Sequence, residues 1–330
     1  MNLFLQEIKP LPADPNVALR KDIALRKDIS NSIQGWNITR NVNSTADPNV
    51  ALRKDISNYI QGWNITRNVN WLLDFAIIGF PKTGTSTLMH YLSNQTDSVF
   101  IFEHERCGIA WGQKVRLLKA LHKNYRENIH MGIKCPSNLE SDHALKEYDE
   151  DFPETKFIIG LRNPVLWFES FYNFRIDNGY NMKRPQELIG SCRKGFHHVC
   201  TNRGNFGKFL KRIQPNRKVF LYDVAQLRND DSLRSERFRQ DLSKFLGLDR
   251  TLDQPMIWHK PGKGLVEEGK IDICDDQYAN LRKILREHAS NSSTWIMSTF
   301  INHPNVQISS PEYFSSILES WHLDPCPKTK

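Results

Sequence analysis

Four short apolar runs, each followed by a segment of helical character, constrain the fold of this chain more than any other feature. The runs are residues 75–79, 131–134, 157–161 and 219–222. Continuous apolar runs of this length are typical of strands that are buried on both faces. Helices are expected at residues 85–93, 138–147, 164–174, 232–245 and 276–288. This alternation predicts an α/β fold, a parallel β-sheet flanked by helices, whose ligand binds at the carboxyl ends of the strands.

The first 70 residues contain a near-identical duplication. Residues 13–23 return as 46–56, and residues 30–43 return as 57–70 with Ser32 replaced by Tyr59. Solenoid units need about three stacked copies, whereas two occur here. We interpret the repeat as a recent duplication or an error in the gene model, with a functional repeat module as the alternative. The chain is therefore divided into a peripheral or poorly ordered segment, 1–70, and one α/β domain, 71–330.

The net charge of the chain favours an anionic partner. Its 45 Lys and Arg residues against 37 Asp and Glu residues give a formal charge of +8, which suits nucleic acid, a phosphate or sulfate cofactor, an acidic glycan or anionic lipid. The basic residues are dispersed, which disfavours nucleic acid. No stretch of about 18 apolar residues occurs, so no membrane-spanning helix is expected, and no secretory signal is visible at the N-terminus.

The most informative segment is residues 75–88, FAIIGFPKTGTSTL, in which a buried strand leads through a Gly/Pro loop into a helix. Backbone N–H groups of such a loop and the helix N-terminus form a phosphate-sized anion site. A nucleoside triphosphate loop has the form G-x-x-x-x-G-K-[ST], but Thr85 occupies the lysine position here and the lysine, Lys82, lies earlier. The strand at 157–161 is followed by Arg162 and not by an Asp that could hold magnesium, so we expect an anion bound without a metal.

Residues 81–87, PKTGTST, resemble the 5′-phosphosulfate loop of the sulfotransferase family, and the chain is most similar in style to the carbohydrate and heparan-type members. The resemblance implies a P-loop NTPase-like sulfotransferase fold. It also implies the donor 3′-phosphoadenosine 5′-phosphosulfate (PAPS), the product adenosine 3′,5′-bisphosphate and no required metal. The residues that it assigns to the donor's 5′ side are Lys82, Thr83, Gly84, Thr85, Ser86 and Thr87.

Residues 156–172 resemble the family's 3′-phosphate motif, with Leu-Arg-Asn-Pro after a strand and a serine eight positions beyond the arginine. Arg162 can bind a phosphate through two N–H groups, and Ser170 would add a hydroxyl. The alternative is that both only cap and solvate a helix. Related carbohydrate enzymes often have an arginine where this chain has Trp167.

A third segment, residues 259–264, HKPGKG, resembles the basic glycine loop that closes over the 3′-phosphate. The resemblance assigns Lys260, Gly262, Lys263 and Gly264 to the nucleotide. An ordinary surface loop rich in Lys and Gly is the alternative.

Sulfuryl transfer needs a base for the acceptor and a cation near the departing phosphate oxygen, and Lys82 suits the second role. Residues 99–107, VFIFEHERC, occupy the place where heparan-type members carry a catalytic glutamate. We favour Glu105 as the base, with His104 and Glu103 as alternatives. In a purely structural interpretation, these residues form only a solvated charge cluster. Lys134, in Lys-Cys-Pro, resembles the family's Lys-x-Pro element and is expected near the sulfuryl group or the acceptor.

The six cysteines are compatible with one to three disulfides in a lumenal enzyme or with free thiols in the cytosol. Cys192 and Cys200 have three interpretations. We favour a disulfide-closed loop near the acceptor over two unrelated thiols, and a zinc site with His197 or His198 is the third.

The resemblance implies an enzyme that transfers a sulfuryl group from PAPS to a hydroxyl or amine, more readily on a carbohydrate than on a phenol or steroid. Its expected partners are the nucleotide donor and a glycan or other acceptor. A P-loop nucleotide kinase or NTPase is one alternative, and a non-catalytic anion-binding protein on a degraded sulfotransferase fold is another. The family favours the Golgi lumen, and the cytoplasm stays open because no signal or membrane segment is visible.

Overall fold

The computed structural model describes residues 69–185, 187, 217–228, 231–252 and 269–326. The duplicated segment apart from its last two residues, the loop at 259–264 and the cysteines at 192 and 200 lie outside these residues.

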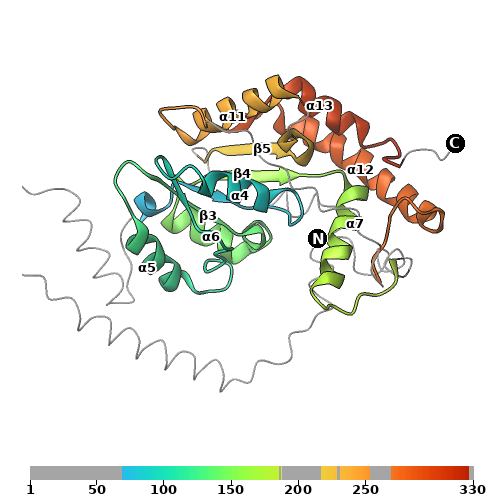
Figure 1. Ribbon diagram of the computed structural model, residues 1–330, viewed down its shortest axis with the longest axis horizontal. Coiled ribbons are helices and arrows are strands. Elements are labelled where there is room, and N and C mark those ends of the chain that lie inside the picture. Colours follow the sequence, from blue (N-terminus) through green and yellow to red (C-terminus); the bar gives the residue numbers. More distant parts are fainter. Residues whose placement is uncertain (1–68, 186, 188–216, 229–230, 253–268, 327–330) are drawn as a thin grey trace, which may run out of the picture. The chain divides into compact units, whose positions relative to one another are not determined.

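A six-stranded sheet forms the centre of the described structure, in the order β2-β3-β1-β4-β5-β6 (Figure 1). All of its neighbouring strands pair in parallel. The strands are β1 (Phe75–Ile77), β2 (Val99–Ile101), β3 (His130–Lys134), β4 (Lys156–Leu161), β5 (Val219–Asp223) and β6 (Val306–Ile308). The predicted α/β fold with a parallel sheet is therefore confirmed.

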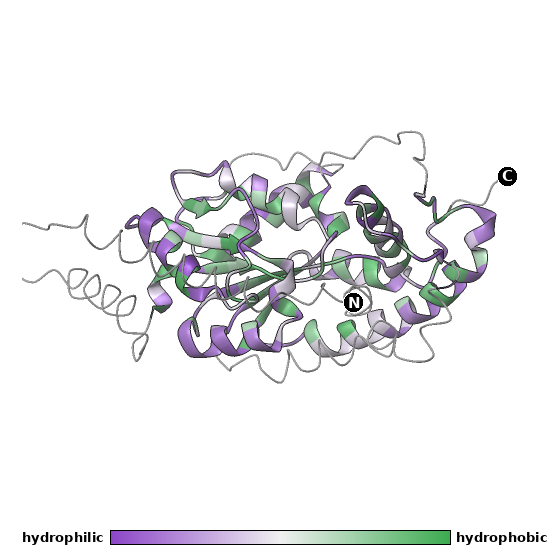
Figure 2. Cartoon of the chain, turned by 90° about the horizontal axis from the view of Figure 1, so that it is seen from below, coloured by the Kyte–Doolittle hydropathy of each residue, from purple (hydrophilic) through white to green (hydrophobic). Residues whose placement is uncertain are grey.

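Helices surround the sheet. They are α4 (Thr85–Ser93), α5 (Lys114–Asn124), α6 (Asp142–Asp151), α7 (Pro164–Asp177), α11 (Ser232–Leu246), α12 (Ala279–Phe300) and α13 (Pro311–Ser320). Short 3-10 turns are η1 (Asn70–Leu72), η2 (Pro136–Leu139), η3 (Val224–Leu227) and η4 (Asp276–Tyr278). The strands are mainly apolar and the helices carry polar residues (Figure 2), as expected for a sheet buried between two helical layers.

The main core lies between the sheet and two helices. Leu88 of α4 and Phe238 of α11 are buried in one cluster with Ile77, Ile158 and Phe220 of the central strands. Helix α12 packs against α7 and α13. The sheet is thus positioned with its carboxyl ends open to the loops that follow β1, β3 and β4.

Some predicted boundaries differ from the structure. The helix predicted at 138–147 begins only at Asp142, because η2 comes first and the Ser141 side chain caps α6 by accepting from the Ala144 N–H. The helix predicted at 276–288 begins at Ala279 and continues to Phe300. The sequence did not predict β2, β6, α5 or α13. Both missed strands have three residues and lie at the edges of the sheet.

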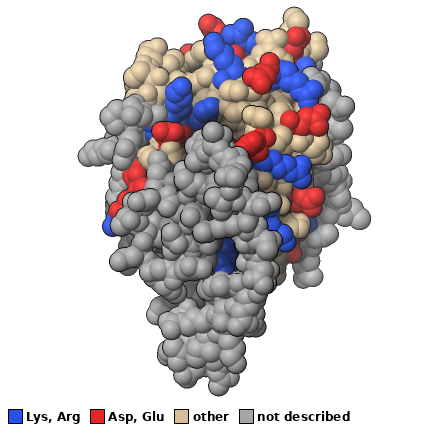
Figure 3. All heavy atoms as spheres, turned by 90° about the vertical axis from the view of Figure 1, so that its left-hand side faces the viewer, with Lys and Arg blue, Asp and Glu red and all other residues tan. Residues whose placement is uncertain are grey.

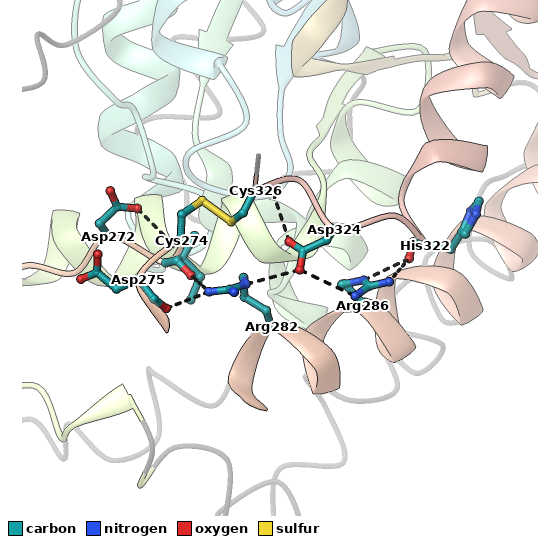
Figure 4. Close-up of polar contacts among 9 residues, drawn as sticks. Asp272, Cys274, Asp275, Arg282, Arg286, His322, Asp324 and Cys326 are labelled. Atoms are coloured by element: carbon teal, nitrogen blue, oxygen red, sulfur yellow. Dashed lines mark hydrogen bonds and ion pairs between the residues drawn. A yellow bond between two sulfur atoms is a disulfide. The ribbon is translucent and has the colours of Figure 1, made fainter. Parts of the chain in front are cut away.

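Two disulfides join described residues, Cys107–Cys135 and Cys274–Cys326. Figure 4 shows the second beside Arg282, whose Nη1 donates to the carbonyl oxygens of residues 273 and 275, each at 2.8 Å. Asp324 lies 3.5 Å from Arg282 Nε. This bridge therefore ties the segment before α12 to the end of the described chain.

The described surface carries mixed charges. In Figure 3, Lys and Arg side chains alternate with Asp and Glu side chains wherever described residues face the viewer. Within the described chain, no helix is long and apolar enough to cross a membrane.

Candidate active site

The loop between β1 and α4 has the backbone of an anion site. Gly79, Lys82 and Gly84 have positive φ values of 132°, 65° and 82°, and Gly84 caps α4 in the left-handed conformation. The first N–H groups of a helix have no partner within the helix. This loop and the start of α4 therefore present free donors and a positive dipole end beside the sheet.

Three side chains from other elements hold the loop by its carbonyl oxygens. Trp167 Nε1, Arg162 Nη1 and Tyr222 Oη donate to the carbonyls of residues 81, 82 and 83, at 2.8, 3.1 and 3.2 Å. In a planar trans peptide the N–H lies opposite the C=O. Because these consecutive carbonyls are bound from behind, the following N–H groups face the other way, toward the proposed anion.

The hydrogen bond from the Trp167 indole to the loop backbone was not predicted from the sequence. Close packing beneath the loop adds to this support. A Cβ on Gly160 of β4 would lie 2.7 Å from Thr83 Oγ1 and from Tyr222 Oη, so only glycine permits this approach.

Three cations lie close enough to affect one another around the loop. Burial lowers the pKa of Lys82, and the charges of Arg162 and Lys134 lower it further. Burial also lowers the pKa of Arg162. The Lys82 ammonium lies 4.7 Å from the centre of the Phe174 ring. Partly buried cations that repel each other favour an anion among them.

Lys134 connects the loop to the candidate base. Its ammonium donates to Ser86 Oγ at 2.8 Å and to Glu105 Oε1 at 2.6 Å. The side chain of Lys134 is 5% exposed and that of Glu105 is 50% exposed. The carboxylate is therefore held at one oxygen and open to solvent beside the anion site, while Glu103 and His104 line a groove along β2.

The Cys107–Cys135 disulfide lies directly at this pair. Cys135 follows Lys134, Cys107 follows Glu105 by two residues, and the Arg106 N–H donates to the Lys134 carbonyl at 2.9 Å. This pairing was not predicted from the sequence. The signal available was the position of one cysteine within two residues of each candidate catalytic residue.

The remaining candidates are placed as follows. Thr83 and Thr85 are buried, and the Thr83 hydroxyl donates to the Phe80 carbonyl at 2.7 Å, so Thr83 offers a ligand its N–H group more readily than its hydroxyl. Thr87 and Ser170 are partly exposed on α4 and α7. Their assignment to the nucleotide stays a prediction.

A buried carboxyl at the end of β5 was also not foreseen. Asp223 Oδ1 accepts from the Ala225 N–H at 2.8 Å, and Oδ2 has no hydrogen-bond partner within the described chain. Burial raises the pKa of Asp223 to about 7, although Arg162 and Arg228 oppose the shift. The carboxyl thus lies near the cation that is proposed to bind the 3′-phosphate.

No protein-family model matches the sequence, and no curated protein matches it. Solved structures do match. A sulfotransferase from Alicyclobacillus acidocaldarius has 18% identity and a TM-score of 0.47, over 68% of this chain and 96% of its own. The sulfotransferase domain from the curacin biosynthetic pathway has 14% identity and a TM-score of 0.34, over 78% of this chain and 93% of its own. These similarities concern the course of the chain alone.

Proposed function

We propose that this protein is a sulfotransferase that uses PAPS and sulfates a hydroxyl or amine, with a carbohydrate as the favoured acceptor. The observation that supports this most is the position of Lys134, which bonds at once to Ser86 at the anion loop and to the half-exposed carboxylate of Glu105. An anion site and a base are thereby adjacent, as acyl- or sulfuryl-type transfer to a hydroxyl requires.

Each residue has a distinct role in the proposal. The loop N–H groups and Lys82 hold the 5′-phosphosulfate, and Arg162 and Ser170 hold the 3′-phosphate. The donor supplies the sulfuryl group, whose bond to the phosphate oxygen breaks as the acceptor atom bonds to sulfur. Glu105 removes the acceptor proton, and Lys82 stabilises the charge that develops on the departing phosphate.

The donor is tested by thermal shift. Adenosine 3′,5′-bisphosphate should raise the melting temperature by mass action more than ATP with magnesium does, because Arg162 and Ser170 would bind the 3′-phosphate. The Arg162→Ala variant should lose this preference. Arg250→Ala, on an exposed arginine paired with Asp97, is the matched control and should keep it.

The reaction is tested with labelled PAPS and a panel of glycans, phenols and lipids. Label on a glycan supports the full proposal, and label on another class corrects the acceptor. A larger stabilisation by ATP with magnesium, together with ATP turnover, would instead show a nucleotide kinase or NTPase. Bisphosphate binding without transfer to any acceptor would show a non-catalytic protein.

A further inference from the structure

Helix α7 carries a row of three aromatic side chains beside the anion loop. They are Trp167, Phe171 and Phe174, and residues spaced four and three positions apart lie on the same side of a helix. The Trp167 and Phe171 rings stack with their centres 5.0 Å apart. The centre of the Phe174 ring lies 6.4 Å from that of Phe171, so the row supports the Phe174 ring from one side.

The two ends of this row meet consecutive residues of the loop between β1 and α4. The Trp167 indole donates to the Pro81 carbonyl at 2.8 Å. The Lys82 ammonium lies over the Phe174 ring, 4.7 Å from its centre, and a cation within about 6 Å of an aromatic centre is attracted by the negative face of the ring. Phe174 is 37% exposed, so its ring lies at the surface beside the loop.

Lys82 is held at its backbone as well as at its side chain. Its carbonyl accepts from Arg162 at 3.1 Å, and its φ of 65° lies in the left-handed region. The side chain of a lysine is a flexible four-carbon stem, so a fixed backbone does not by itself fix the ammonium. The Phe174 ring supplies the second point of attachment.

The surroundings of Lys82 disfavour its charge. Burial lowers the pKa of Lys82, and the charge of Arg162 lowers it further. The Asp177 carboxylate raises this pKa and the Lys134 charge lowers it, and Asp177 is itself paired with Lys270 at 2.5 Å. An aromatic face attracts the ammonium without carrying a negative charge that would repel an anionic ligand. A ring therefore suits this position better than a second carboxylate would.

We propose that Phe174 is a positioning residue for Lys82, whose ring holds the ammonium beside the anion loop, where it can stabilise a departing phosphate. Phe174 acts through Lys82 and takes no part in the bonds that form and break. The inference rests on the proposed function only for its effect on turnover, because the contact between ring and ammonium is present without a donor.

The direct test is the titration of Lys82 in the full chain, followed by its rate of modification with an amine-reactive reagent across pH and read by peptide mass spectrometry. Phe174→Leu should move the midpoint to lower pH by about 0.5 to 1 pH unit, because one cation–π contact is lost. Phe174→Tyr keeps an aromatic face and should restore the midpoint.

Tyr180→Leu is the matched control. Tyr180 is 38% exposed, and the Arg175 guanidinium lies over its ring, 4.4 Å from the centre. The variant therefore removes a similar contact from a different cation, and the titration of Lys82 should stay unchanged.

Fluorinated phenylalanines at position 174 separate the charge effect from packing. They keep the shape of the ring while each added fluorine weakens its negative face. The midpoint of Lys82 should therefore decrease stepwise with the number of fluorines. A midpoint that stays constant across this series would show a packing role only and would overturn the inference.

Turnover is the second readout. Phe174→Leu should lower turnover at saturating donor by about three- to tenfold and Phe174→Tyr should restore it, while the bisphosphate thermal shift persists in both. An unchanged Lys82 midpoint in Phe174→Leu, or an equal change in Tyr180→Leu, contradicts the inference. A lowered midpoint in a chain that transfers no sulfuryl group would refute the proposed function alone, and an unchanged midpoint in a chain that does transfer it would refute the role of Phe174 alone.

Discussion

Lys134 is a buried ammonium, and the free-energy cost of burying it is offset only by its partners. Removing one member of a buried ion pair typically costs about 3–5 kcal/mol, but Glu105 is half exposed and water can solvate it. The ion pair therefore positions Glu105 more than it stabilises the fold. Lys134 holds one carboxylate oxygen and leaves the other accessible.

The separation of roles between Glu105 and Lys82 gives the first prediction. Glu105→Gln keeps the shape of the side chain but removes the base, so turnover should fall by roughly 10²- to 10⁴-fold while the bisphosphate thermal shift is unchanged. Lys82→Ala should lower turnover by about 10²-fold or more for every acceptor. Steady-state rates and thermal shifts on both variants provide the measurement.

Glu150→Gln, on an exposed glutamate of α6, is the matched control for this prediction. His104→Ala should retain most of the activity. Near-normal turnover of Glu105→Gln combined with inactivity of His104→Ala would move the base to the histidine.

Asp223 gives a prediction for the pH dependence of stability. The carboxyl has a pKa of about 7 in the folded chain against an ordinary value of 3.8, so between these values the native state holds a proton that the unfolded state has lost. The contribution of this carboxyl to the free energy of unfolding should be highest below about pH 4, decrease toward pH 7 and then level off, a total on the order of 4 kcal/mol.

Asp223→Asn keeps the oxygen that accepts from Ala225 and removes the titration, so its urea-unfolding free energy should lose this decrease between pH 4 and pH 7. Asp249→Asn, on an exposed aspartate, should keep it. An unchanged pH profile in Asp223→Asn would show that this carboxyl is not the source.

At the scale of elements, the Cys107–Cys135 disulfide joins the segment after β2 to the end of β3, next to both Glu105 and Lys134. Replacing both cysteines by serine should lower turnover at saturating donor by about tenfold or more, because the base loses its position. The bisphosphate thermal shift should persist, since the loop between β1 and α4 is held by other side chains.

The second bridge is the control (Figure 4). Cys274–Cys326 closes a span of 52 residues against 28 for Cys107–Cys135, so the loop-entropy model assigns each about 4 kcal/mol and slightly more to the control. If turnover followed stability alone, the Cys274→Ser/Cys326→Ser variant would lose at least as much turnover as the Cys107→Ser/Cys135→Ser variant. We expect it to keep turnover below its melting temperature, and equal losses would contradict the positioning role.

The fold was predictable from the apolar runs that form the four central strands, whereas the two edge strands were missed. Residues 85–93 were predicted as the helix that α4 forms, since a glycine and a Ser/Thr-rich first turn define its start. The three-residue strand β2 was not predicted, although it forms the groove. Its residues, Val-Phe-Ile, favour a strand, but they were interpreted as the lead into the charged segment 103–106, and the pairing with β3 that defines β2 is a tertiary contact.

The candidate site, like the fold, could be predicted only in part from the sequence. Lys82, Glu105 and Lys134 could be selected from local motifs, and the structure brings the last two into contact. The bond from Trp167 to the loop spans 86 residues, and the burial of Asp223 depends on how the sheet is covered. Such features follow from tertiary packing, which no local pattern encodes.

At the scale of the whole molecule, the last two residues of the duplication belong to the described domain. The end of the second copy, Val69–Asn70, is buried, and Asn70 Oδ1 accepts from the Glu154 N–H at 3.0 Å. The first copy ends in the same two residues, Val42 and Asn43, but in the described structure it is Val69 and Asn70 that make these contacts.

Deletion of residues 1–45 should leave the melting temperature, the bisphosphate thermal shift and turnover close to those of the full chain, because the second copy and every described element remain. Deletion of residues 1–72 is the contrasting variant, since it also removes buried Leu72. Loss of one buried leucine costs about 2–5 kcal/mol, so this chain should melt several degrees lower. Equal destabilisation by both deletions would show that the first copy is structural, because the shorter deletion removes none of the contacts at Val69 and Asn70.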